Sequence, residues 1–130
     1  MNQDRAIYPH IKVLVVEDYD LNLEIIVEML RILGIEPDTA VSGKEAIEKV
    51  ERSPYDLILM DIKMPEMDGY EATKKIRSMP IRQPQIFALT ASGVVSDMED
   101  FVNSGMEDYL IKPIEVSDLK KIILKHFSAE

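Results

Sequence analysis

The sequence predicts an α/β domain in which five parallel strands form one sheet that helices cover on both faces. Short apolar runs alternate with longer segments of helical period five times along the 130 residues. Three of the runs are nearly continuous in apolar residues, as strands buried on both faces require. Five successive βα units of this kind are joined by right-handed crossovers, which places the strands parallel.

The expected strands are short and differ in character. They are Lys12–Glu17, Glu36–Ala40, Asp56–Met60, Ile86–Leu89 and Asp108–Ile111. The second run, EPDTA, is weakly apolar and contains a proline. Proline cannot donate to a sheet ladder, so this run is predicted to be an edge strand.

The segments between the strands show helical spacing and helix-start signals. Apolar residues recur at helical intervals in three sets: Ile26, Met29, Leu30 and Leu33; Met98, Phe101, Val102 and Gly105; and Leu119, Ile122 and Ile123. Gly34 follows the first set as a stop. Three helix starts resemble capping boxes, in the pairs Ser42 with Glu45, Asp68 with Glu71 and Ser96 with Glu99.

Composition restricts the classes of function. The chain has the size of a single domain, which we expect to span 1–130 with a core of about 11–126. It has no cysteine, which excludes thiolate chemistry and fits a reducing, cytoplasmic compartment. Apolar runs reach four residues, too short for membrane insertion, and the first ten residues lack the apolar stretch of a signal peptide.

The net charge of −9 argues against direct nucleic-acid binding and favours a cation or a basic partner. The nearest basic cluster lies close to the end of the chain and comprises Lys120, Lys121, Lys125 and His126. The simpler interpretation of this cluster is the solvated face of a last helix, and not a nucleic-acid site.

Four of the five strand ends carry a charged or hydroxyl side chain. Glu17 and Asp18 follow the first strand, Asp61 the third, Thr90 the fourth and Lys112 the fifth. In an open parallel sheet these ends share one edge, where ligands bind. Each residue also has an ordinary structural role: Asp18 could cap a helix, Asp61 and Thr90 could form turns, and Lys112 could be solvated. The joint pattern favours a site.

The residue types at this edge suit phosphoryl transfer. Clustered carboxylates need a cation between them, and hard oxygen ligands favour Mg²⁺. A carboxylate can attack phosphorus and form an aspartyl phosphate, for which Asp61 on the central strand is best placed. Lysine and hydroxyl groups neutralise and hydrogen-bond the transferred group. Asp18 and Glu17 are then metal ligands, directly or through water.

Four motifs in order resemble the receiver domain of two-component response regulators, most closely the receivers of hybrid histidine kinases. They are VLVVEDYDLN, DLILMDIKMPEMDGYEA, ALTAS and GMEDYLIKPI, and the resemblance covers about residues 11–126. It implies a flavodoxin-like (βα)5 doubly wound sheet with strand order 2-1-3-4-5.

The resemblance also implies roles for individual residues. Asp61 would accept the phosphoryl group, Lys112 would pair with it and Thr90 would hydrogen-bond to it. Mg²⁺, or Mn²⁺, would be bound by Asp18 and Asp61, by the backbone carbonyl of Lys63 and, mainly through water, by Glu17. Tyr109 would be the switch aromatic on a surface formed by the fourth helix, the fifth strand and the fifth helix. The Lys112–Pro113 bond would be cis.

Three positions depart from the hybrid-type pattern. Tyr19 stands where asparagine commonly follows the acidic pair, and Lys63 stands where glutamine or asparagine is frequent. Lys63 and Ser92 border the expected path of an attacking water, and neither orients water well. The sequence therefore predicts slow hydrolysis of the phosphoaspartate.

The expected partner is a histidine kinase or histidine phosphotransfer protein that docks on the first helix. Nine of the thirteen residues from Leu21 to Leu33 are apolar, and Leu21, Ile25 and Ile32 form a second stripe beside the core stripe. The alternative is that neighbouring helices cover this stripe. The switch surface could meet an effector or form a homodimer.

Three other functions compete with a signalling receiver that is not a metabolic enzyme. A haloacid-dehalogenase-type phosphohydrolase needs an acid two residues after its nucleophile, where this chain has Lys63. An FMN carrier needs an anion-accepting loop after the first strand, where Glu17 and Asp18 would repel phosphate. A non-phosphorylated scaffold would not need Asp61, Thr90 and Lys112 together.

Overall fold

The structure is a computed structural model that describes residues 10–91 and 98–127. Its strands are β1 (Val13–Val16), β2 (Asp38–Ala40), β3 (Leu57–Asp61), β4 (Gln85–Thr90) and β5 (Asp108–Ile111). Its helices are α2 (Asp20–Ile32), α3 (Gly43–Arg52), α4 (Gly69–Arg77), α5 (Met98–Ser104) and α6 (Val116–His126). Strands and helices alternate along the chain, as predicted.

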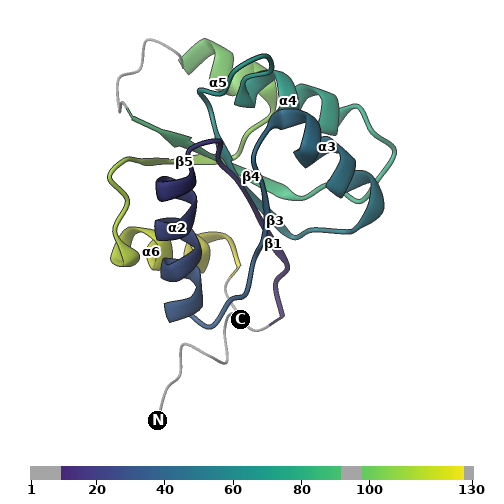
Figure 1. The fold of residues 1–130 in the computed structure, drawn as a ribbon. Helices are drawn as coiled ribbons and strands as arrows, with labels where there is room; N and C mark the ends of the chain where they lie inside the picture. The colour runs from purple at the N-terminus through teal and green to yellow at the C-terminus, as the bar shows by residue number, and fades with distance from the viewer. Residues whose placement is uncertain (1–9, 92–97, 128–130) are drawn as a thin grey trace.

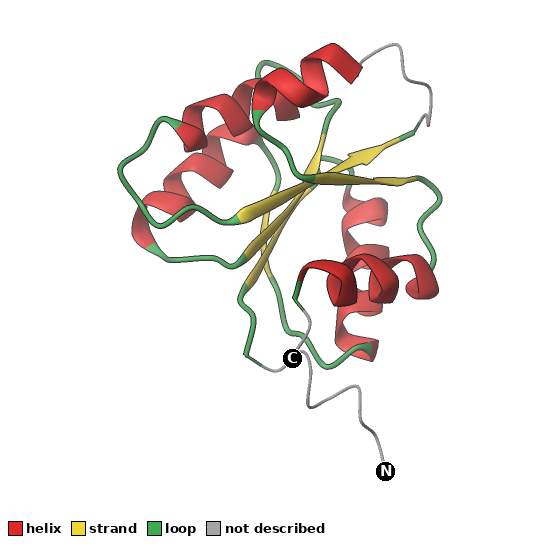
Figure 2. Ribbon diagram, turned by 180° about the vertical axis from the view of Figure 1, so that it is seen from behind, coloured by secondary structure: helices red, strands yellow, loops and turns green. Residues whose placement is uncertain are grey.

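The five strands form one parallel sheet in the order β2-β1-β3-β4-β5. This confirms the predicted fold class, strand order and edge position of the proline-preceded second strand. Helices α2 and α6 cover one face of the sheet, and α3, α4 and α5 cover the other (Figures 1 and 2).

Alternation along the buried strands supplies both cores. Val13 and Val15 of β1 pack in the core beneath α2 and α6, whereas Leu14 and Val16 pack in the core beneath α3, α4 and α5. Successive side chains of a strand point to opposite faces, so a continuously apolar strand serves two layers.

Helix starts follow the predicted capping signals in part. Asp68 and Glu71 form a reciprocal capping box at α4, with bonds of 2.8 and 3.0 Å. Ser42 accepts from the Glu45 backbone N–H at 3.1 Å, but the Glu45 carboxylate accepts from Val41 instead of Ser42. Ser96 lies outside the described residues.

Two sequence expectations are corrected. Asp61 and Thr90 are the last residues of their strands and not the first residues beyond them, because Asp61 pairs with Leu89 and Thr90 with Ile111 in the parallel ladder. Met98 and Val102, expected on a buried helix face, are exposed. The short helix α5 turns Phe101 and Ser104 towards the protein instead.

Among the described residues, no helix is long and apolar enough to cross a membrane.

Candidate functional site

The predicted site residues meet at the carboxyl edge of the sheet. Glu17 and Asp18 directly follow β1, Asp61 ends β3, Thr90 ends β4, and Lys112 directly follows β5. Because β1, β3, β4 and β5 are consecutive in the sheet, their carboxyl ends lie in a row. The sheet order thus assembles one site from residues that lie far apart in the sequence.

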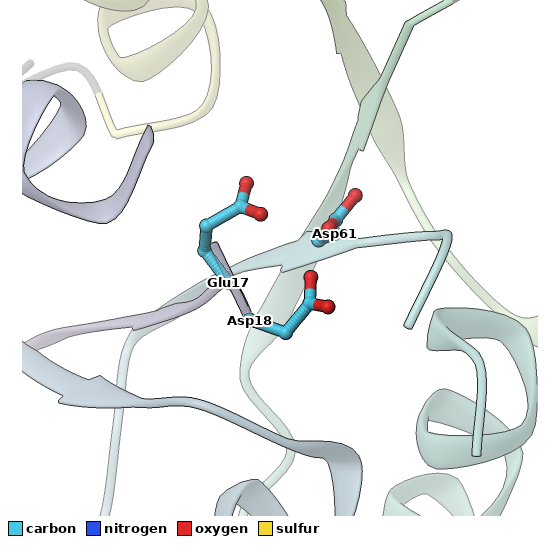
Figure 3. Close-up of side chains that lie close together, drawn as sticks. All are labelled: Glu17, Asp18 and Asp61. Carbon is cyan, nitrogen blue, oxygen red and sulfur yellow. The ribbon is translucent and has the colours of Figure 1, made fainter. Parts of the chain in front are cut away.

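Three carboxylates converge at this edge (Figure 3). Oxygen atoms of Glu17, Asp18 and Asp61 all lie within 4.8 Å of one another. Glu17 and Asp61 are buried, with 1% and 4% of their surface exposed, whereas Asp18 is exposed. Two buried acids and one exposed acid form a cluster of carboxylates that solvent reaches at Asp18.

Lys112 lies across the two buried acids. Its Nζ is 3.0 Å from Glu17 Oε1 and 3.3 Å from Asp61 Oδ1. Burial disfavours the charged ammonium, but hydrogen bonds and charge interactions with Glu17 and Asp61 outweigh it and raise the pKa of Lys112. Lys112 is therefore a fixed positive charge that touches Asp61.

The electrostatic environment opposes ionisation of Asp61. Burial and the neighbouring Glu17 raise the pKa of Asp61 to about 7, while Lys112 acts in the opposite direction. One lysine therefore does not compensate the local negative charge, and a bound cation would relieve the repulsion.

Backbone bonds hold the site residues in place. The Lys63 N–H points at Asp61 Oδ1 at 3.4 Å, and the Tyr19 N–H donates to Glu17 Oε2 at 3.3 Å. The Lys112 N–H donates to the Thr90 carbonyl at 2.7 Å, which fixes the end of β5 against the end of β4.

Gly69 is a site-supporting residue that the sequence analysis missed. A Cβ at this position would lie 2.4 Å from the Asp61 carbonyl oxygen and 2.9 Å from Ile62 Cα. The Gly69 N–H also donates to the Ile62 carbonyl at 2.8 Å. Only glycine allows α4 to begin this close to the backbone of the candidate phosphoacceptor. The signal was the glycine that directly follows the helix cap Asp68.

The remaining predicted residues surround this centre. Tyr109 is 40% exposed on β5, and its ring meets that of Phe101 edge-on at a centroid distance of 5.9 Å. The Lys112–Pro113 peptide bond is cis. Lys63 is exposed in the loop after β3, and Ser92 lies outside the described residues.

The second stripe of α2 is exposed. Leu21, Ile25 and Ile32 have 55%, 46% and 69% of their surface accessible, so neighbouring helices do not cover them. Beside Ile25, a groove of about 360 Å³ runs between α2 and the loop after β5. Its lining residues are Asn22, Ile25, Ile26, Lys112, Pro113 and Ile114.

Clustered carboxylates beside a lysine, at the carboxyl edge of a doubly wound sheet, have the donor chemistry that a hard divalent cation requires. The family model of the response regulator receiver domain matches residues 13–124. The chain therefore belongs to the receiver-domain family of two-component signalling.

Curated proteins similar to the chain include hybrid histidine kinases and a sensor protein. The chain is 38% identical over 122 residues to hybrid signal transduction histidine kinase L of Dictyostelium discoideum, covering 88% of this chain and 7% of that protein. It is 35% identical over 131 residues to the aerobic respiration control sensor protein ArcB of Escherichia coli K12, covering 99% of this chain and 17% of that protein. The chain thus spans a small part of these relatives.

Two solved structures resemble the chain closely. The receiver domain of sensor histidine kinase PA1611 from Pseudomonas aeruginosa PAO1, with magnesium coordinated in its active site cleft, has a TM-score of 0.84 at 38% identity. The match covers 92% of this chain and 98% of that one. The receiver domain of Ssk1, solved with the Saccharomyces cerevisiae histidine phosphotransfer protein Ypd1, has a TM-score of 0.83 at 33% identity, covering 93% and 91%.

Proposed function

We propose that Asp61 accepts a phosphoryl group from a phosphohistidine, in a Mg²⁺-dependent reaction that the receiver domain itself catalyses. The observation that carries this proposal is the arrangement around Asp61. Its carboxylate ends the central strand, lies beside two further carboxylates and touches Lys112. The receiver core of about residues 11–126 would act as one unit. It would act in the cytoplasm, because a sequence without cysteine fits a reducing compartment.

The donor set fits a hard divalent cation. Three carboxylates with oxygens within 4.8 Å of one another concentrate negative charge that Mg²⁺ or Mn²⁺ would neutralise. Asp18, Asp61 and the Lys63 carbonyl would hold the ion, with Glu17 bonded mainly through water. The bound ion supplies charge neutralisation for the phosphoryl oxygens.

The protein groups then have distinct roles in transfer. An Asp61 carboxylate oxygen attacks phosphorus and forms the P–O bond while the P–N bond to the donor imidazole breaks. The imidazole nitrogen keeps the bonding electrons and takes a proton from solvent water. The Lys112 ammonium pairs with a phosphoryl oxygen instead of with Asp61 and Glu17. The Thr90 hydroxyl donates a hydrogen bond to another.

The phosphorylated state is read on a second surface. Phosphorylation moves Lys112 and Thr90. The backbone N–H of Lys112 donates to the Thr90 carbonyl, and this bond links the end of β4 to the end of β5. Tyr109 on β5 packs on Phe101 of α5, so a change at β5 reaches the α5–β5–α6 surface. An output partner or a second copy of the chain would bind there.

The phosphodonor is a histidine kinase or histidine phosphotransfer protein that docks on α2. The exposed Leu21 and Ile25 lie at the end of α2 that follows Asp18, and the groove beside Ile25 includes Lys112. This apolar surface therefore continues into the site. Lys63 and Ser92 leave the attacking water poorly oriented, so hydrolysis of the phosphoaspartate is slow.

Intact-mass measurement after incubation with acetyl phosphate tests the proposal. The wild type should gain one phosphoryl group in the presence of Mg²⁺, lose it in hydroxylamine and gain none in EDTA. Asp61→Asn should gain none. A wild type that remains unmodified in Mg²⁺ and binds no beryllofluoride would support the scaffold function instead.

A further inference from the structure

The docking surface on α2 has an acidic border on one side. Asp20, Glu24 and Glu28 recur every four residues and are all exposed. Residues four apart lie above one another on a helix, so the three acids form a row next to the row of Leu21 and Ile25.

The two sides of this apolar surface differ in chemistry. On one side, Ile25 borders the groove that Asn22, Pro113 and Ile114 line. On the other side, Glu24 precedes Ile25 by one residue and so lies about 100° around the helix from it, away from the groove residue Ile26. A partner on Leu21 and Ile25 therefore meets an apolar groove on one flank and carboxylates on the other.

The charge of this border is concentrated near the phosphoacceptor. Glu28 is paired with Arg31 at 2.8 Å, and Arg31 also binds Glu36 at 2.9 Å. Relative to Glu28, Glu24 lies about one turn and Asp20 about two turns closer to Asp18 and the site. Among the residues that the structure describes, Asp20 and Glu24 form no ion pair. Acids at the edge of an apolar interface select partners by charge and steer their approach.

We propose that the cognate phosphodonor presents an apolar helix face bordered by Lys or Arg, and that these basic residues pair with Asp20 and Glu24 while an apolar side chain fills the groove beside Ile25. This inference rests on the proposed function, because it describes how the donor of the same site is recognised. The occupant is the phosphodonor, since the groove beside Ile25 leads to Lys112, which touches Asp61.

Phosphotransfer from two matched probes tests the inference. The probes are forms of one histidine phosphotransfer domain that carry either lysines or glutamates beside the phosphohistidine. The wild type should accept from the lysine form about tenfold faster, and the difference should shrink as salt is raised. The double variant Asp20→Lys/Glu24→Lys should prefer the glutamate form.

Controls separate recognition from folding. Asp20 is in the first turn of α2, where a lysine opposes the helix dipole, so Glu24→Lys alone serves as a second variant and should reduce the preference. Glu48→Lys/Glu51→Lys on the exposed face of α3 should keep the wild-type preference. Equal rates from both probes to the wild type, or the same reversal in the α3 variant, would overturn the inference. Failure of acetyl phosphate to label the wild type would instead contradict the proposed function.

Discussion

At Asp61, burial and Glu17 outweigh the attraction of Lys112, and the pKa of the carboxyl rises to about 7. A folded-state pKa above the ordinary value means that stability is greatest when Asp61 is protonated and falls as pH rises towards and through about 7. In EDTA at pH 8, Asp61→Asn should therefore raise the free energy of unfolding by about 1–3 kcal/mol. The gain should disappear near pH 4. Urea denaturation at both pH values measures it, and equal stabilities at pH 8 would contradict this account of Asp61.

Gly69 makes a second residue-scale prediction. Its missing Cβ leaves room for the Asp61 carbonyl oxygen, which would otherwise lie at 2.4 Å. Gly69→Ala should cost about 1–3 kcal/mol in stability, because the backbone atoms must move apart. It should also slow acetyl phosphate labelling, since Asp61 moves with its backbone.

Gly43→Ala at the start of α3 is the matched control. There, the nearest atom to the added Cβ is the flexible Met67 side chain, at 3.0 Å. This variant should be close to wild type in urea denaturation and in labelling. Equal losses in the two variants would show that glycine at a helix start matters by itself, whatever its neighbour.

The sequence predicted which site residues share the edge but not how they contact one another. The spacing of apolar runs places Glu17, Asp61 and Lys112 at strand ends, because parallel strands share one carboxyl edge. It does not show that Lys112 bonds to Glu17 as well as to Asp61, since that contact depends on side-chain conformations across three strands. The role of Gly69 was missed because it depends on the close approach of the start of α4 to the backbone of Asp61 and Ile62, which the sequence pattern does not show.

At the scale of elements, α2 combines a core face with an exposed apolar face, which is the proposed docking face. Ile26 and Leu30 are buried in the core, while Leu21, Ile25 and Ile32 are exposed. The apolar content of the sequence predicted two apolar stripes on this helix. Only the packed structure shows that α6 leaves the second stripe uncovered.

Ile25→Asp tests this docking face. It should slow phosphotransfer from a histidine phosphotransfer protein by about tenfold or more, because a buried interface anchor becomes a charge. Labelling by acetyl phosphate should stay at the wild-type rate. Ile32→Asp, at the far end of the same helix, should affect neither rate strongly. Equal loss in both assays for Ile25→Asp would refute the docking role.

The end of α6 is fastened to the start of β5 by Asp108. The Asp108 carboxylate meets His126 Nε2 at 2.9 Å, Lys125 Nζ at 3.3 Å and the Tyr109 N–H at 2.8 Å. Burial acts to raise the pKa of Asp108, but these hydrogen bonds outweigh burial and lower it. Of the basic cluster expected on a solvated helix face, Lys125 is solvated, with 69% of its side chain exposed, whereas His126 is mostly buried against Asp108.

The sign of the shift at Asp108 gives a pH-dependent prediction. A lowered folded-state pKa contributes stability above the ordinary carboxyl pKa and loses it as pH falls through the folded value. Asp108→Asn should therefore destabilise the protein by about 1 kcal/mol at pH 7. The difference should shrink below pH 4. Urea denaturation across this range measures it, and a difference that grows on acidification would contradict the assignment.

At the scale of the whole molecule, the fold follows from patterning, and the signalling surfaces follow from the fold. Five apolar runs and their order define a doubly wound sheet, because alternating βα units admit few other arrangements. The exposed positions of α5 were predicted poorly. Its short length lets Phe101 face the protein while Met98 and Val102 face solvent.

Mapping the phosphoryl group by borohydride reduction tests the central claim most directly. Reduction converts a phosphoaspartate to homoserine, which peptide mass spectrometry locates in the chain. After treatment with acetyl phosphate and Mg²⁺, homoserine should appear at position 61 and not at position 18, and Glu17 should remain unreduced. Modification at another acidic residue, with Asp61 unchanged, would contradict the account.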